Sequence, residues 1–131
     1  MAIRILRIAV IYMMIGSSMG LLMGITHQFQ YAPVHAHINL LGWASLGLIG
    51  VIYHIYPRAA QTRLAQLHFW LHNLGLPIFM ISLFLLILGE RTAELGIAFG
   101  AVITLVGILL FTINIMRTVP MPRQHRAPQH G

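Results

Sequence analysis

Four long, almost uncharged apolar runs constrain this sequence more than any other feature. They cover roughly Ile8–Ile25, Val34–Tyr56, Leu67–Leu88 and Ala93–Met116, and Glu94 is their single charged residue. Each run has about 18 to 24 residues, which as an α-helix is long enough to cross a hydrocarbon core of about 30 Å. A helix satisfies its backbone N–H and C=O groups internally. The runs therefore predict an all-α integral membrane bundle of four helices.

The composition excludes the main alternatives to a helical membrane protein. Hydrophobic residues make up 58% of the chain and charged residues 8%, too few charges to cover a soluble domain of this size. The short alternating segments of a β-barrel are absent, and without cysteine there is no disulfide framework or thiolate metal site. We expect a four-span domain over residues 1–119 and a disordered cytoplasmic tail over 120–131, which is rich in Pro, Gln, His and Arg.

The arginines are distributed asymmetrically along the chain. The connection Thr26–Pro33 contains none, and the connection after Leu88 holds Arg91 together with Glu90. The other arginines lie before the first run, between the second and third runs, or after the fourth: Arg4, Arg7, Arg58, Arg63, Arg117, Arg123 and Arg126. The positive-inside rule predicts cytoplasmic termini in a multi-pass protein of a bacterial-type inner (cytoplasmic) membrane. Because these arginines act as topology signals, the net charge of +6 does not indicate nucleic-acid binding.

Six histidines lie within the apolar runs or at their edges, where an ionisable side chain is costly and its default interpretation is functional. They are His27, His35, His37, His54, His68 and His72. Zinc and non-haem iron sites usually add a carboxylate or a cysteine, whereas a haem needs only one or two axial imidazoles and an apolar slot. The carboxylate-poor runs therefore favour haem b. Arg91, the one arginine predicted on the outer side, is the candidate for a propionate contact.

The spacing of His35 and His37 limits how they can bind haem. Residues two apart on an α-helix are separated by about 200°, so the two rings face nearly opposite sides of the second span. They cannot be the two axial ligands of one haem. Each is expected to serve a different pocket, and because four helices offer little interior for two haems, we expect pockets shared between subunits.

The segment HAHINLLGWASLGLIGVIYHIYPRAAQTRLAQLHFWLHNLG resembles the tenth and eleventh helices of haem-copper oxidase subunit I. The C-type oxidases and the related nitric oxide reductases are the most similar branch. The resemblance depends on His35-x-His37, on Gly42-Trp43, on the exit Tyr53–Pro57 and on the start of the next helix at His68-Phe69-Trp70. It covers about Val34 to Gly89, under half of the chain.

This resemblance implies a role for each member of the histidine pair. In the family, the first histidine is the axial ligand of the high-spin, gas-reducing haem, and the second is a ligand of the low-spin, electron-transferring haem. Carried over by motif, His35 takes the first role and His37 takes the second. No ligand role is carried over to His54 or His68.

The chain also departs from the family, whose subunit I contains three pseudo-equivalent groups of four helices. Here the helix with the copper-binding histidines is missing, as is the helix that supplies the other ligand of the low-spin haem. If the chain corresponds to one group, three copies could rebuild the arrangement as a symmetric homotrimer. Bis-histidine haem at the subunit interfaces would lack an open coordination position, which favours electron transfer with an electron donor or oxidase partner.

Three alternatives remain open. An oxidoreductase that reduces oxygen or nitric oxide needs a second metal beside an open haem site, and His27 and His72 are candidate contributors to such a haem or copper site. A sensing or delivery module would bind haem without turnover. Copper handling is the third, because the chain contains eight methionines, including Met19, and the tail residues His125 and His130 also suit copper.

Overall fold

The computed structural model of the chain describes residues 1–120 and is built from helices throughout that range. The first half contains α1 (Ala2–Thr26), a short 3₁₀ turn (Phe29–Tyr31), α2 (Ala32–His37), a π-helical segment (Ile38–Ser45) and α3 (Leu46–Ile55). The second half contains α4 (Pro57–Ala60), α5 (Arg63–Ile87), a second 3₁₀ turn (Arg91–Ala93) and α6 (Glu94–Thr118). Within residues 1–120 there is no β-strand.

The predicted all-α membrane fold is confirmed. Four helical stretches are long and apolar enough to cross a membrane: Ala2–Thr26, Phe29–Ile55, Arg63–Ile87 and Arg91–Thr118. Each includes most or all of one apolar run of the sequence, and the chain is therefore a multi-pass membrane protein. The tail expected to be disordered lies outside the described residues, apart from Pro120.

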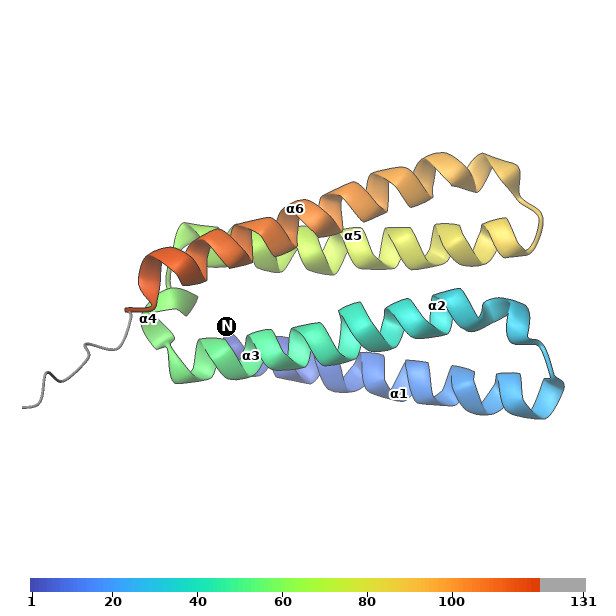
Figure 1. Ribbon diagram of the computed structural model, residues 1–131, viewed down its shortest axis with the longest axis horizontal. Coiled ribbons are helices and arrows are strands. Elements are labelled where there is room, and N and C mark those ends of the chain that lie inside the picture. The colour runs from blue at the N-terminus through green and yellow to red at the C-terminus, as the bar shows by residue number, and fades with distance from the viewer. Residues whose placement is uncertain (121–131) are drawn as a thin grey trace, which may run out of the picture.

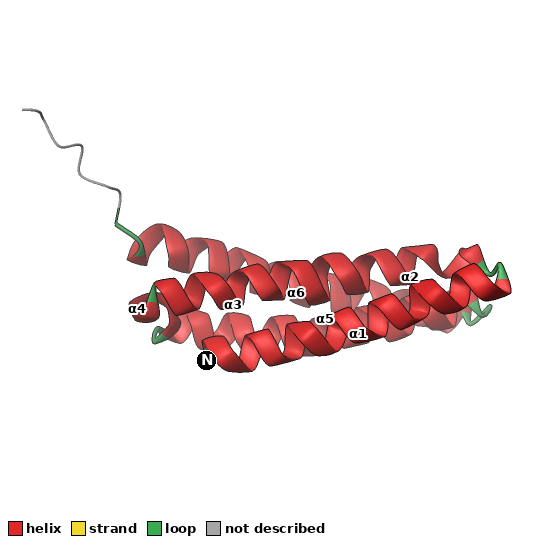
Figure 2. Cartoon of the chain, turned by 90° about the horizontal axis from the view of Figure 1, so that it is seen from below, coloured by secondary structure: helices red, strands yellow, loops and turns green. Residues whose placement is uncertain are grey.

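The four spans form two helical hairpins that lie side by side. In Figure 1, α1 runs antiparallel to α2 and α3, and α5 runs antiparallel to α6. The N-terminus, α4 and the end of α6 lie together at one end, and the view in Figure 2 shows the same long axis for all spans. We call this end the arginine-rich end, because Arg4, Arg7, Arg58, Arg63 and Arg117 begin or follow the spans there.

Small residues allow α5 and α6 to approach closely. A Cβ atom added at Gly107 would lie 3.1 Å from the backbone nitrogen of His72, and one added at Gly75 would lie 2.8 Å from the backbone nitrogen of Thr104. At Gly100 an added Cβ would overlap the backbone of Phe79. The apolar environment provides no hydrophobic force between helices, so backbone approach at such residues supplies much of the packing.

Buried side chains form two apolar clusters along the bundle axis. The first lies toward the arginine-rich end and comprises Ile5, Ala9, Leu46, Ile49, Tyr53, Ala59 and Ala65. The second lies toward the opposite end and comprises Val34, Ile38, Leu76 and Met80. The second cluster joins the two hairpins, because Val34 and Ile38 belong to the second span and Leu76 and Met80 belong to α5. Val34 and Ile38 also flank the His35-x-His37 segment in the sequence.

Asn114 of α6 forms a polar connection beside the first cluster. Its Nδ2 donates to the carbonyl oxygen of Ala59 at 2.8 Å and to the hydroxyl of Tyr53 at 3.4 Å. Its Oδ1 accepts a hydrogen bond of 2.8 Å from Thr62, whose hydroxyl also caps α5 by accepting from the backbone nitrogen of Ala65. Asn114 is fully buried, and this one amide links α3, α4 and α6.

Candidate histidine site

The ring of His35 packs against α1 at Gly16 and Gly20. Its Nδ1 is 2.9 Å from the carbonyl oxygen of Gly16. A carbonyl oxygen can only accept, so the ring nitrogen must donate, and the lone pair of the neutral imidazole is then on Nε2. A backbone carbonyl that holds the other ring nitrogen is the usual partner of a metal-ligating histidine.

The glycines of α1 provide the space for this arrangement. A Cβ at Gly20 would lie 2.8 Å from Cε1 of His35, and a Cβ at Gly16 would lie 2.5 Å from Nδ2 of Asn39. Asn39 in turn donates from Nδ2 to the carbonyl oxygen of His35 at 2.9 Å. Gly16 and Gly20 therefore leave room for polar side chains of the second span, whereas Gly24 has open space around it.

His37 has the same tautomer but faces a different helix. Its Nδ1 lies 2.7 Å from the carbonyl oxygen of Pro33, so Nδ1 donates and Nε2 carries the lone pair. The ring lies edge-on to Phe79 of α5, with centroids 5.1 Å apart. As the spacing predicts, the two histidines contact different helices: His35 contacts α1 and His37 contacts α5.

The π-helical segment begins directly after His37. In it, Ser45 donates from its hydroxyl to the carbonyl oxygen of Leu40, five residues earlier, at 2.7 Å. The carbonyl oxygen of Leu41 accepts a hydrogen bond from Nε2 of His72 at 3.1 Å. Such segments are rare and occur frequently at functional sites; this one turns a carbonyl of the second span toward α5.

A second histidine pair, His68 and His72, is fully buried in α5. Their ring centroids are 5.4 Å apart, and Nδ1 of His68 donates to the carbonyl oxygen of Gly107 at 2.9 Å. Nε2 of His68 and Nδ1 of His72 are buried without a hydrogen-bond partner. His72 was a predicted candidate ligand but its pairing with His68 was not predicted, although the spacing of four residues places both rings on one face of a helix.

The remaining candidates lie apart from these pairs. His27 ends α1 in the left-handed region, with φ of 56°, and is exposed beside Phe29. His54 is exposed in the last turn of α3. Arg91 is exposed in the connection between α5 and α6, and this connection lies at the end opposite the arginine-rich end (Figure 1). Across residues 1–120, no three side chains of the kinds that ligate metals come together.

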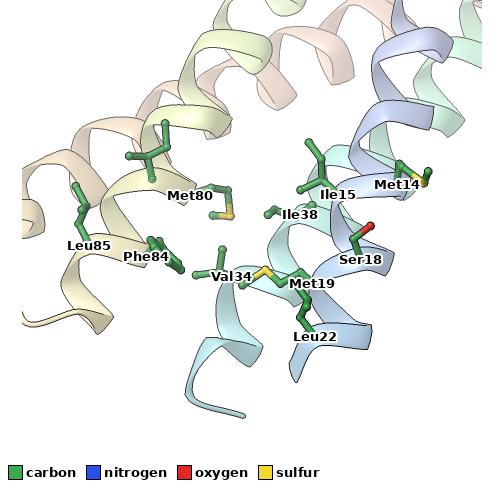
Figure 3. Close-up of a pocket in the computed structure, with 11 residues that line it drawn as sticks. Met14, Ile15, Ser18, Met19, Leu22, Val34, Ile38, Met80, Phe84 and Leu85 are labelled. Atoms are coloured by element: carbon green, nitrogen blue, oxygen red, sulfur yellow. The ribbon is translucent and has the colours of Figure 1, made fainter. Parts of the chain in front are cut away.

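An apolar groove of about 590 Å³ lies between α1, α2 and α5. Figure 3 shows Met80 and Phe84 on the α5 side and Met19 on the α1 side, with Val34 and Ile38 of the second span between them. Ser18 supplies the one side-chain hydroxyl in the lining. The groove has the apolar character of a slot for a flat hydrophobic ligand or an acyl chain.

The histidine pair of α2 fits the requirements of haem ligation. Each ring has its Nδ1 oriented by a carbonyl oxygen and its Nε2 lone pair available as a ligand. Both rings lie on an apolar helix, and within residues 1–120 neither belongs to a group of three or more His, Cys, Asp or Glu side chains that could hold another metal. The donor set therefore suits neutral imidazole ligation of a haem iron.

Comparison with known proteins gives a partial match to an oxidase subunit. The Cbb3-type cytochrome c oxidase subunit CcoN1 of Stutzerimonas stutzeri is 28% identical over 65 residues, which cover 45% of this chain and 14% of the relative. No family model matches the chain, and no solved structure matches it. The similarity supports a distant relationship to haem-copper oxidase subunit I, of which the chain spans a small part.

Proposed function

We propose that this protein binds haem b through His35 and His37 and transfers electrons within the membrane. The observation that carries the proposal is that both imidazole rings have the same tautomer and the same kind of hydrogen-bond partner. Each donates from Nδ1 to a backbone carbonyl, at 2.9 Å for His35 and 2.7 Å for His37, and each keeps the Nε2 lone pair for a metal. The partial similarity to an oxidase subunit supports the same assignment.

The two histidines serve two different haems in this proposal. His35 contacts α1 and His37 contacts Phe79 of α5, so one iron cannot receive both rings as opposite axial ligands. The second ligand of each haem then comes from a neighbouring copy, and a symmetric homotrimer is the assembly that closes such contacts. Arg91, exposed at the same end of the bundle as the start of α2, is the proposed propionate contact.

The chemistry follows from the ligand set. Haem iron with two imidazole ligands supplies one-electron transfer and has no open position for a gas. The chain's own residues hold the imidazoles in one tautomer and exclude water with apolar side chains. The membrane is proposed to be the bacterial-type inner membrane, with an electron donor or an oxidase as the redox partner.

The test is the reduced-minus-oxidised optical spectrum of the purified protein, with iron measured per chain. We expect the sharp bands of low-spin haem b, about one iron per chain because each chain supplies two imidazoles and each haem takes two, and no change when carbon monoxide is added to the reduced protein. A strong shift with carbon monoxide indicates an open site and reassigns the protein to gas reduction or sensing. A haem-free monomer after reconstitution with haem contradicts the proposal.

Copper handling is the second candidate, because three methionines line the groove between α1, α2 and α5. Met14, Met19 and Met80 present thioethers there, and thioethers select Cu(I). Methionine also fills gaps in apolar packing, so the metal content decides between the two functions. Copper without iron in the purified protein replaces the haem proposal, and iron without copper removes this candidate.

A further inference from the structure

The arginine-rich end has an excess of positive charge that the described protein does not balance locally. Five arginines lie there: Arg4, Arg7, Arg58, Arg63 and Arg117. Both carboxylates, Glu90 and Glu94, lie at the opposite end. Spans of 25 residues separate the two ends by about 37 Å, far beyond the distance at which exposed charges interact through salt solution.

Two clefts lie on either side of Arg4 at this end. The first has a volume of about 470 Å³ and lies between α1 and α5, with α4 also contributing to its lining. The second has a volume of about 510 Å³ and lies between α1, α3 and α4. Arg4 and Gln61 line both, so one guanidinium and one amide are available to a ligand in either cleft.

The first cleft combines polar donors with an aromatic wall. Arg4, Gln61 and Gln66 provide guanidinium and amide N–H groups, and Phe69 and Trp70 of α5 provide the apolar side. The side chain of Trp70 is 61% exposed, and tryptophan is enriched where a helix crosses the membrane surface. The cleft therefore offers hydrogen-bond donors for a headgroup beside an apolar surface for an acyl chain.

We infer that the cleft between α1 and α5 binds the phosphate headgroup of an anionic membrane phospholipid, with Arg4 as the principal cation. The guanidinium matches the paired oxygens of a phosphodiester, and the amides of Gln61 and Gln66 complete the donors. Basic pockets between membrane helices are suited to anionic headgroups. This inference does not depend on haem, because none of these residues belongs to the proposed haem site.

Native mass spectrometry of the detergent-purified full chain tests this assignment. Phosphatidylglycerol and phosphatidylcholine are titrated separately, since both carry a phosphodiester but only the first is anionic. We expect phosphatidylglycerol to bind at least fivefold more tightly, and Arg4→Gln to weaken it by roughly fivefold, the contribution of one basic residue near an anionic surface. Arg117→Gln is the matched control, because it removes an exposed arginine from the same end but from neither cleft.

Three results would overturn the inference. Equal affinity for the two lipids removes the charge selectivity. An equal loss in Arg117→Gln means that the whole end attracts anions without a site. Displacement of phosphatidylglycerol by inorganic phosphate at the same concentration means that the cleft takes free phosphate and not a lipid. Circular dichroism confirms that both variants keep the helical content of the wild type.

Discussion

His72 donates a hydrogen bond from Nε2 to the carbonyl oxygen of Leu41, 3.1 Å away, and this bond joins the two helical hairpins. His72 is fully buried, and its partner lies in the π-helical segment of the second span. Leu41 lies in the second span between His37 and Leu46, the first residue of α3. The bond is a polar contact between two hairpins that pack mostly through apolar side chains.

Replacing His72 with leucine should therefore loosen the association of the hairpins. The variant removes this hydrogen bond to the Leu41 carbonyl, which costs about 1–2 kcal/mol in unfolding free energy. His54→Leu, at an exposed position, should change it by less than about 0.5 kcal/mol. Equilibrium unfolding by SDS in mixed micelles measures both. Equal stability of the two variants would show that the bond does not hold the hairpins.

Gly20→Ala should disturb His35 without disturbing the rest of α1. The added Cβ would lie 2.8 Å from Cε1 of His35, so the ring must move from its position over the helix and its Nδ1 from the Gly16 carbonyl. We expect the haem content per chain to fall severalfold. Gly24→Ala is the matched control, because it makes the same substitution in the same helix with nothing within 4 Å. Identical haem content in the two variants contradicts the proposed role of this contact.

Asn114→Leu should destabilise the arginine-rich end. The substitution removes one partner each from the Ala59 carbonyl, the Tyr53 hydroxyl and the Thr62 hydroxyl. The Thr62 hydroxyl can still donate to the Ala59 carbonyl at 3.2 Å, so we expect a cost of about 1–3 kcal/mol in total at this site. Thr112→Val, two residues away in the same helix, removes only an exposed bond to the Ile108 carbonyl. The same unfolding measurement should show a large loss for the first variant and almost none for the second.

Gly100→Ala should separate α5 from α6. An added Cβ at this position overlaps the backbone of Phe79, and backbone cannot rotate aside as a flexible side chain can. Overpacking of this kind costs about 1–3 kcal/mol. Because Phe79 also contacts the ring of His37, the variant should lose haem as well as stability. Retention of full stability would mean that α5 and α6 do not approach closely at Gly100.

The membrane fold followed from the sequence because its signal is strong and local. The apolar runs are much longer than a globular core requires, and the described spans include nearly all of each run. The separation of His35 and His37 also followed, since helical geometry alone fixes the angle between residues two apart. Their contacts with α1 and α5 could not be predicted, because these depend on how the hairpins pack.

Other features had weak signals or none. The π-helical segment Ile38–Ser45 contains no residue pattern that distinguishes it from an α-helix. Its effect, a Leu41 carbonyl that accepts a hydrogen bond from His72, is visible only in the structure. The His68 and His72 pair was visible as a spacing of four, but its burial depends on α6. Asn114 resembled an isolated polar residue in an apolar run, and its three partners come from segments more than 50 residues earlier in the chain.

The central claim is that His35 and His37 are haem ligands, and substituting each separately by alanine tests it most directly. Haem and iron per chain are measured for both variants and for His54→Ala, which replaces an exposed histidine of the same span. We expect each of the first two variants to lose most of its haem or to gain a carbon monoxide shift, and the third to match the wild type. Full haem content and an unchanged spectrum in both His35→Ala and His37→Ala would contradict the claim.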